Sequence, residues 1–171
     1  MATPDWSLRR YGALCRALLE GPYAPWTMAG YLSNGPDRAV VLRHDVDRFP
    51  ADALAMARLE SSLGIGATYY LRMVPGVYSP ELAREIAALG HEVGYHYEVL
   101  AKARGHMDAA LARFAEELAE LRRHVPVVTA TAHGSPLSPW DSLAIWEHAR
   151  PEDFDLAGEP YLAPALSHLA Y

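Results

Sequence analysis

The chain has 171 residues, a formal net charge of −6 and one cysteine. This length fits a single domain, and a hydrophobic share of 51% is enough to form a core. The acidic balance and the lack of a basic patch argue against nucleic-acid binding. The single thiol, Cys15, excludes an internal disulfide. It falls in an apolar helical pattern without a basic neighbour, which indicates a structural role.

The N-terminal residues give no sign of a targeting segment. Residues 1–10 contain no apolar run of the kind found in secretory signals. No apolar stretch in the chain reaches the roughly 18 residues that a transmembrane helix needs. We therefore expect a cytoplasmic protein that does not insert into a membrane.

Helical and strand-like patterns alternate along the chain. The first helix is followed by a stretch rich in Pro and Gly (21–37), for which no element is predicted. Pro50 is suited to the first turn of a helix, and Ser79 to an N-cap. The predicted helices cover 7–20, 50–63, 79–90 and 107–124, with a short one after Pro139. The predicted strands cover 38–44, 67–73, 91–97 and 127–132, with a candidate fifth strand around 154–157.

This alternation predicts an α/β fold in which parallel strands are joined by helical crossovers. The periodicity is compatible with a barrel and with an open sheet. Polar clusters end three of the predicted strands, at 44–47, 95–98 and 133–135. Because the carboxyl ends of parallel strands form one rim, where ligands bind in such folds, we expect these clusters to converge.

Asp45 and Asp47 are the most informative pair. Two residues apart on a strand, they would point to the same side, where their charges repel unless a cation lies between them. A divalent metal would relieve this repulsion, and His96 would add a nitrogen ligand, which favours zinc. The alternative is that Asp45 and Asp47 cap the helix that begins at Pro50, a role for which Asp47 is the better placed.

The remaining polar residues at the rim are weaker candidates. His133 ends a strand beside Gly134, where backbone can approach a ligand, so it is expected to contact the metal or the substrate. His91 begins a strand after a helix, which favours a structural hydrogen-bonding role. Tyr97 follows His96 and is a candidate sugar-facing ring.

Three segments resemble motifs of the polysaccharide deacetylase (NodB-homology) family, in the family's order. They are residues 42–47 (LRHDVD), 90–96 (GHEVGYH) and 132–136 (AHGSP), and the second is the most specific. The resemblance extends over about 38–160. It implies a distorted (β/α) barrel and a zinc-like ion. It also implies removal of acyl groups, usually N-acetyl, from an amino sugar or polysaccharide precursor.

The resemblance also implies roles for individual residues. Asp45 matches the general base, and His96 matches a metal ligand. Val46 occupies the position of the family's metal-binding aspartate, so Asp47 would take that role. The family's second metal histidine falls on Leu100, so the third ligand would come from another residue, either His133 or Glu98.

A mechanism follows from this assignment. Asp45 would take the proton of the attacking water, and His133 would protonate the leaving amine. Backbone N–H groups near Gly134 would stabilise the oxyanion. The expected substrate contacts are Tyr97, Glu98, Gly134 and Ser135.

Two other functions remain open. One is a catalytically inactive, deacetylase-like domain that binds carbohydrate. The other is a metal-dependent barrel hydrolase that acts on a cyclic amide or a phosphoester. Metal analysis and a substrate screen would separate them.

The C-terminal region is expected to be the part of the domain that depends most on further contacts to bury its apolar residues. A complete barrel of the family is longer, so residues 1–171 would form a partial barrel that is short at its C-terminal end. The tail from Gly158 carries Tyr161, Leu162, Leu166, Leu169 and Tyr171. We expect these apolar groups, or a second copy of the chain, to cover the exposed sheet edge, which predicts a homodimer.

Overall fold

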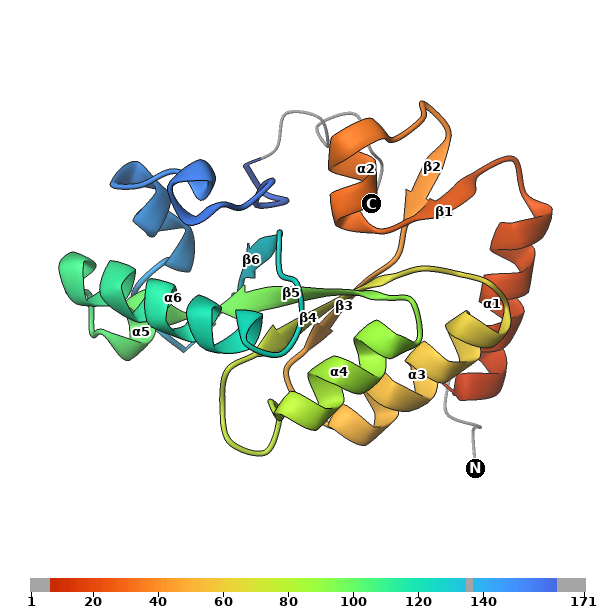
Figure 1. Ribbon diagram of the computed structural model, residues 1–171, viewed down its shortest axis with the longest axis horizontal. Helices are drawn as coiled ribbons and strands as arrows, with labels where there is room; N and C mark the ends of the chain where they lie inside the picture. The colour runs from red at the N-terminus through yellow and green to blue at the C-terminus, as the bar shows by residue number, and fades with distance from the viewer. Residues whose placement is uncertain (1–6, 135–136, 163–171) are drawn as a thin grey trace.

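The computed structural model describes residues 7–134 and 137–162 of the chain (Figure 1). Its α-helices are α1 (Leu8–Glu20), α2 (Met28–Asn34), α3 (Pro50–Ser62), α4 (Pro80–Ala88), α5 (Val99–Lys102) and α6 (Met107–Arg122). Two 3₁₀ helices follow, η1 (Ser142–Glu147) and η2 (Pro151–Phe154). The strands are β1 (Ala24–Trp26), β2 (Ala39–Val41), β3 (Arg43–Val46), β4 (Thr68–Arg72), β5 (Glu92–Tyr97) and β6 (Ala130–Ala132).

A parallel four-stranded sheet in the order β3-β4-β5-β6 forms the centre of the fold. The prediction of parallel strands alternating with helices is confirmed. The sheet is curled into a half-barrel, and within the described part of the chain it stays open, with β3 and β6 at its edges (Figure 1). All carboxyl ends of these strands meet at one rim, as the sequence predicts.

The N-terminal third contains two elements that the sequence patterns did not predict. The Pro/Gly-rich stretch holds β1, which pairs with β2 in a separate two-stranded sheet, and α2. Both are short, so neither shows a full period of apolar residues. The side chain of Thr27 caps α2 by accepting the N–H of Gly30 at 3.1 Å. The predicted strand 38–44 is also two strands, β2 and β3, which belong to different sheets.

The two faces of the main sheet differ in chemistry because neighbouring strand residues point in opposite directions. The convex face carries buried rings, and Tyr95 and Tyr97 pack against Phe114 of α6 with ring centroids 5.1 and 5.2 Å apart. Helices α3, α4 and α6 lie along this side (Figure 1). The concave face is polar. Its members include Thr68, Tyr70, Glu92, His96, Thr129 and Thr131.

Glycine at position 94 is required by close packing on the concave face. A Cβ there would lie 2.3 Å from the ring of Tyr70 on the neighbouring strand. The missing side chain lets the Tyr70 ring lie across β5. This ring in turn packs under the guanidinium of Arg43, 5.3 Å from its centroid.

The edge of the sheet at β6 is covered by the C-terminal segment. The candidate fifth strand at 154–157 is wrong as a strand, since η2 occupies part of it. Pairing occurs slightly later, through one parallel bridge between Thr129 and Gly158 and a 2.7 Å bond from Ala157 N–H to the Val128 carbonyl. The expectation that the tail covers this edge is therefore confirmed for its first residues. Leu166, Leu169 and Tyr171 lie outside the described residues, and the homodimer stays a prediction.

A buried carboxylate ties α1 to the main sheet. Glu60 of α3 has no exposed surface. Its Oε1 accepts hydrogen bonds from Tyr11 of α1 and, at 2.6 Å, from Nε2 of His44 in β3. Its Oε2 accepts the hydroxyl of Tyr69 at 2.6 Å. Because these partners come from separate elements, the network fixes β3, and hence the residues that follow it, relative to the helical layer.

The structural role predicted for His91 is confirmed. Its buried Nδ1 accepts the N–H of Ala67 at 3.1 Å, and its Nε2 lies 2.8 Å from the carbonyl of Ala57, to which it donates. Both ring nitrogens are thus used within the core, and His91 lies away from the rim.

Glu60→Gln should destabilise the protein by about 3 kcal/mol at pH 7, because it leaves buried polar partners unmatched. Burial alone would raise the pKa of Glu60, but the hydrogen bonds and charge of His44, with the Tyr11 and Tyr69 hydroxyls, lower it below its usual value. The network therefore stabilises the fold above the unfolded-state pKa of about 4.3, and this contribution is lost as the pH falls through the lower folded-state pKa.

Urea unfolding of both proteins at pH 7 and at pH 4 and below would measure this effect. The difference between wild type and Glu60→Gln should shrink at the acid end. Glu85→Gln is the matched control, since Glu85 forms an exposed ion pair with Arg58 and should change stability by less than about 1 kcal/mol. A difference independent of pH would show that Glu60 is held uncharged.

Candidate metal centre

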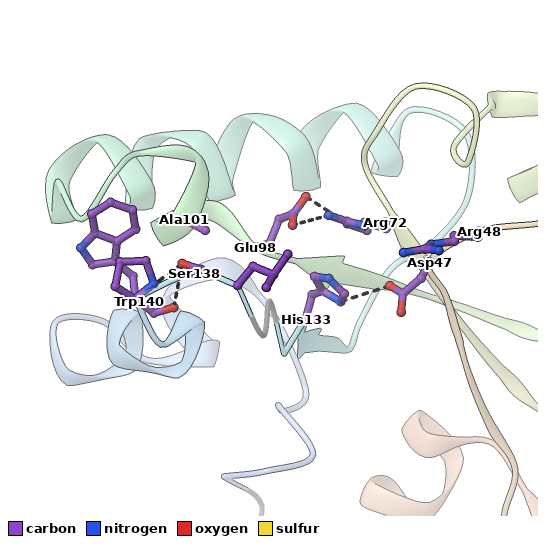
Figure 2. A pocket seen from close by; sticks show the side chains of 10 residues that line it. Asp47, Arg48, Arg72, Glu98, Ala101, His133, Ser138 and Trp140 are labelled. Atoms are coloured by element: carbon purple, nitrogen blue, oxygen red, sulfur yellow. Dashed lines mark hydrogen bonds and ion pairs between the residues drawn. The ribbon is translucent and has the colours of Figure 1, made fainter.

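Three side chains converge at the carboxyl ends of β3, β5 and β6. Asp47 follows β3, His96 lies in β5 and His133 follows β6. The backbone N–H of His133 bonds to the Tyr97 carbonyl at 2.7 Å, which extends the β5–β6 pairing and places His133 beside His96. Figure 2 shows the His133 ring directed at the carboxylate of Asp47. The convergence of the three predicted metal ligands at one rim is therefore confirmed.

The ligand atoms form a nearly equilateral triangle. Asp47 Oδ1 lies 3.3 Å from His96 Nε2 and 3.1 Å from His133 Nδ1. The two nitrogens lie 3.3 Å apart. Donor atoms bound at about 2.0–2.1 Å to a tetrahedral ion are separated by about 3.3–3.4 Å, so this spacing suits a zinc-sized ion.

His96 is prepared to act as a neutral ligand. It is almost fully buried, and its Nδ1 donates to the Thr131 carbonyl at 3.1 Å. This bond fixes the tautomer and leaves the lone pair of Nε2 directed at the cluster. Burial lowers the pKa of His96 against the opposing effect of the Asp45 and Asp47 charges, which keeps the imidazole unprotonated near neutral pH.

Asp47 supplies an oxygen that lacks a conventional partner. Its Oδ1 is buried and makes no hydrogen bond with good geometry, although two histidine nitrogens lie close to it. A buried carboxylate oxygen without a donor is costly unless a cation balances it. The residues present thus fit a divalent metal, and a group of Asp47, His96 and His133 could hold one.

Asp45 lies at the same rim but is held differently from the expected arrangement. Both of its oxygens are bonded by the Arg43 guanidinium, at 2.8 and 2.7 Å. Its Oδ2 is 4.0 Å from His96 Nε2. The argument that a metal must relieve the Asp45–Asp47 repulsion is therefore incomplete, because Arg43 already compensates Asp45. Tyr161 also packs against Arg43, with its ring centroid 5.0 Å from the guanidinium carbon.

Glu98 already forms ion pairs with Arg72 and Lys102, so His133 is the better candidate for the third metal ligand. Two hydrogen bonds of 3.0 and 2.6 Å connect the Glu98 carboxylate to Arg72. Burial opposes its charge, but Arg72 and Lys102 lower the pKa of Glu98 below its usual value. Leu100, at the position of the family's second metal histidine, is buried in the core and carries no ligand atom.

Tyr97 is not a substrate contact. Its side chain is fully buried, and its hydroxyl accepts the indole N–H of Trp146 at 2.7 Å. It points to the convex face because it is adjacent to His96, which points to the concave face. Gly134 is exposed at the rim, and a Cβ there would meet no protein atom within 4 Å, so its predicted role in backbone approach to a ligand stays a prediction. Ser135 lies outside the described residues.

A pocket of about 600 Å³ opens beside the cluster (Figure 2). Asp47, His133 and Glu98 contribute to its wall. The sequence patterns did not single out its other lining residues, Arg48, Arg72, Ala101, Leu137, Ser138, Pro139 and Trp140. Arg48 could have been suspected from its place directly after Asp47. Trp140 could not, because it reaches the pocket from a segment with no periodic pattern.

Neither the models of known protein families nor the curated protein sequences include a match to this chain. Among the described residues, no helix is both long and apolar enough to cross a bilayer.

Proposed function

We propose that this protein is a metal-dependent hydrolase that removes acyl groups, N-acetyl above all, from an amino sugar or a polysaccharide precursor. The observation that carries the proposal is the triangle of Asp47, His96 and His133, which has ligand spacing and contributes Asp47 and His133 to the wall of a pocket. The resemblance of three sequence segments to the polysaccharide deacetylase family supports the choice of substrate.

Zinc is the proposed metal because the donor set is two imidazoles and one carboxylate. When bound, such an ion supplies Lewis-acid activation of an acyl carbonyl and of water. Asp47 offers the negative charge, and the two histidines offer neutral nitrogens. The Thr131 carbonyl keeps the His96 ring oriented.

Asp45 is the proposed general base. It lies beside the proposed metal ligands, with its Oδ2 4.0 Å from His96 Nε2, and Arg43 fixes the orientation of its carboxylate. A lone pair not used by Arg43 can take the proton of the attacking water. The same carboxyl group can then deliver this proton to the leaving nitrogen.

His133 was a candidate for two roles, metal ligand and proton donor. One nitrogen cannot serve both roles, since a nitrogen bound to a metal carries no proton to donate. Its Nδ1 is the atom nearest to Asp47 and His96, so the proposal assigns it to the metal.

An inactive carbohydrate-binding domain is the second candidate function. The observation that favours it is the bidentate hold of Arg43 on Asp45, which engages both oxygens of the proposed base. The two candidates share the metal and the pocket but differ in turnover.

Acetate release by zinc-loaded protein from N-acetylated and O-acetylated sugars would test the proposal. Hydrolysis of a cyclic amide and of a phosphoester would be measured separately, through their own products. We expect release from an acetylated sugar that stops on chelation and returns with zinc. Metal-dependent turnover of the cyclic amide or phosphoester alone would reject deacetylation. Bound zinc and sugar without any turnover would establish the inactive domain.

A further inference from the structure

Arg48 is a positive charge in the pocket with no ion-pair partner in the described part of the chain. It follows the metal-ligand candidate Asp47, lines the pocket and is exposed. Within residues 7–134 and 137–162, no carboxylate forms an ion pair with it. In Figure 2 it lies next to Asp47, at the end of the pocket opposite Trp140.

Of the other charged residues of the pocket, Arg72 and Glu98 balance each other, and Asp47 belongs to the candidate metal cluster. Arg72 is paired with Glu98 at 2.6 Å. Asp47 is directed at the two histidines. The lining carboxylates, Asp47 and Glu98, equal the guanidinium groups, Arg48 and Arg72, in number. A divalent ion therefore leaves the pocket with a net positive charge, in a chain whose net charge is −6.

The backbone at this point is held in an uncommon conformation. Phe49, the N-cap residue of α3, has a φ of 53°, in the left-handed region. Its side chain is 70% exposed, so core packing does not explain it. Such strain in a bulky residue persists only where the surroundings fix the chain, and it often occurs at ligand sites. Here it lies in the turn that carries both Asp47 and Arg48.

From these observations we infer that the substrate is an acylated amino sugar carrying an acidic group, a phosphate or a carboxylate, and that Arg48 binds this group. The inference rests on the proposed function and names its substrate class. A guanidinium matches both anions because its N–H groups form paired hydrogen bonds to two oxygens.

The position of Arg48 also limits where the acidic group lies. Arg48 and the metal-ligand candidate Asp47 both line the pocket, so one ligand bound there can contact both. The acid should therefore lie on the same sugar ring as the acyl group, close to it. N-acetylglucosamine 1-phosphate and N-acetylmuramic acid have this arrangement, with a phosphate and a carboxylate respectively.

Calorimetric titration of zinc-loaded protein with these two compounds and with neutral N-acetylglucosamine would test the inference. At least one acidic sugar should bind about tenfold or more tightly than the neutral one. Arg48→Gln should reduce this preference to about twofold or less, while Arg58→Gln, an exposed arginine of α3 paired with Glu85, should leave it unchanged. The acidic sugar that binds more tightly identifies the source of the anion.

Zinc retention by Arg48→Gln, measured separately, distinguishes failure of this inference from failure of the proposed function. A wild-type protein that binds no zinc would reject the metal-dependent function itself. With zinc bound, equal affinity for neutral and acidic sugars, or no binding of the acidic ones, would overturn the inference. A preference that survives Arg48→Gln would also overturn it, because the anion would then be bound by the metal.

Discussion

His133→Ala should lower zinc affinity by more than the roughly 10- to 100-fold that loss of an outer partner of a metal site costs. The reason is that Nδ1 of His133 is one of three atoms in the ligand triangle, 3.1 Å from Asp47 Oδ1. The fold should persist, because His133 lies at the rim and is absent from the hydrophobic core. Competition with a chromophoric chelator measures the affinity, and urea unfolding of the metal-free protein measures the stability.

Two variants make this result specific. His106→Ala removes an exposed histidine at the start of α6 and should leave zinc affinity unchanged. Glu98→Gln tests the other candidate ligand. Because Glu98 is paired with Arg72, this change should alter the local structure of the pocket more than it alters zinc affinity. Unchanged affinity in His133→Ala together with a large loss in Glu98→Gln would move the third ligand to Glu98.

Asp45→Asn should reduce deacylation about 10²- to 10⁴-fold, the usual effect of losing a general base, while zinc binding persists. Asparagine keeps the shape of aspartate and one oxygen acceptor for Arg43, so the local structure should survive. Steady-state acetate release and zinc stoichiometry measured on the same preparation separate the two effects. Asp52→Asn, at an exposed position in the first turn of α3, is the control.

Other outcomes would change the assignment of Asp45. A parallel loss of zinc and activity would make it a metal ligand. Unchanged turnover would show that the ion pair with Arg43 keeps it out of the reaction.

Much of the rim could be predicted because strand ends are local features. The apolar cores of β4 and β5 and the Pro and Gly residues around them define where the strands stop. Parallel order then brings the ends together without any knowledge of packing. Asp47, His96 and His133 were found in this way, although they are separated by up to 86 positions along the chain.

Two errors contradicted information that the sequence already carried. Arg43 and Asp45 are two residues apart, so on a strand they share a face, and the ion pair between them follows from the same rule that paired Asp45 with Asp47. Tyr97 adjoins His96 and therefore points away from it. Applying the alternation of strand side chains to every residue of the motif would have removed Tyr97 from the site.

The remaining features depend on contacts between distant parts of the chain. The buried position of Glu60 requires Tyr11, His44 and Tyr69 from three other elements, and nothing near Glu60 in the sequence indicates them. Similarly, the pairing of Gly158 with Thr129 is a single bridge rather than a strand. The residues of this segment show no β pattern. What holds the segment at the sheet edge is the bridge itself and the hydrogen bond from the Ala132 N–H to the Glu159 carboxylate.

The most direct test of the metal centre is anomalous diffraction at the zinc edge from crystals of the protein soaked in zinc. We expect one strong peak about 2.0–2.2 Å from Asp47 Oδ1, His96 Nε2 and His133 Nδ1, with the pocket on its open side. No peak among these three atoms, or zinc bound only at surface carboxylates elsewhere, would contradict the proposal.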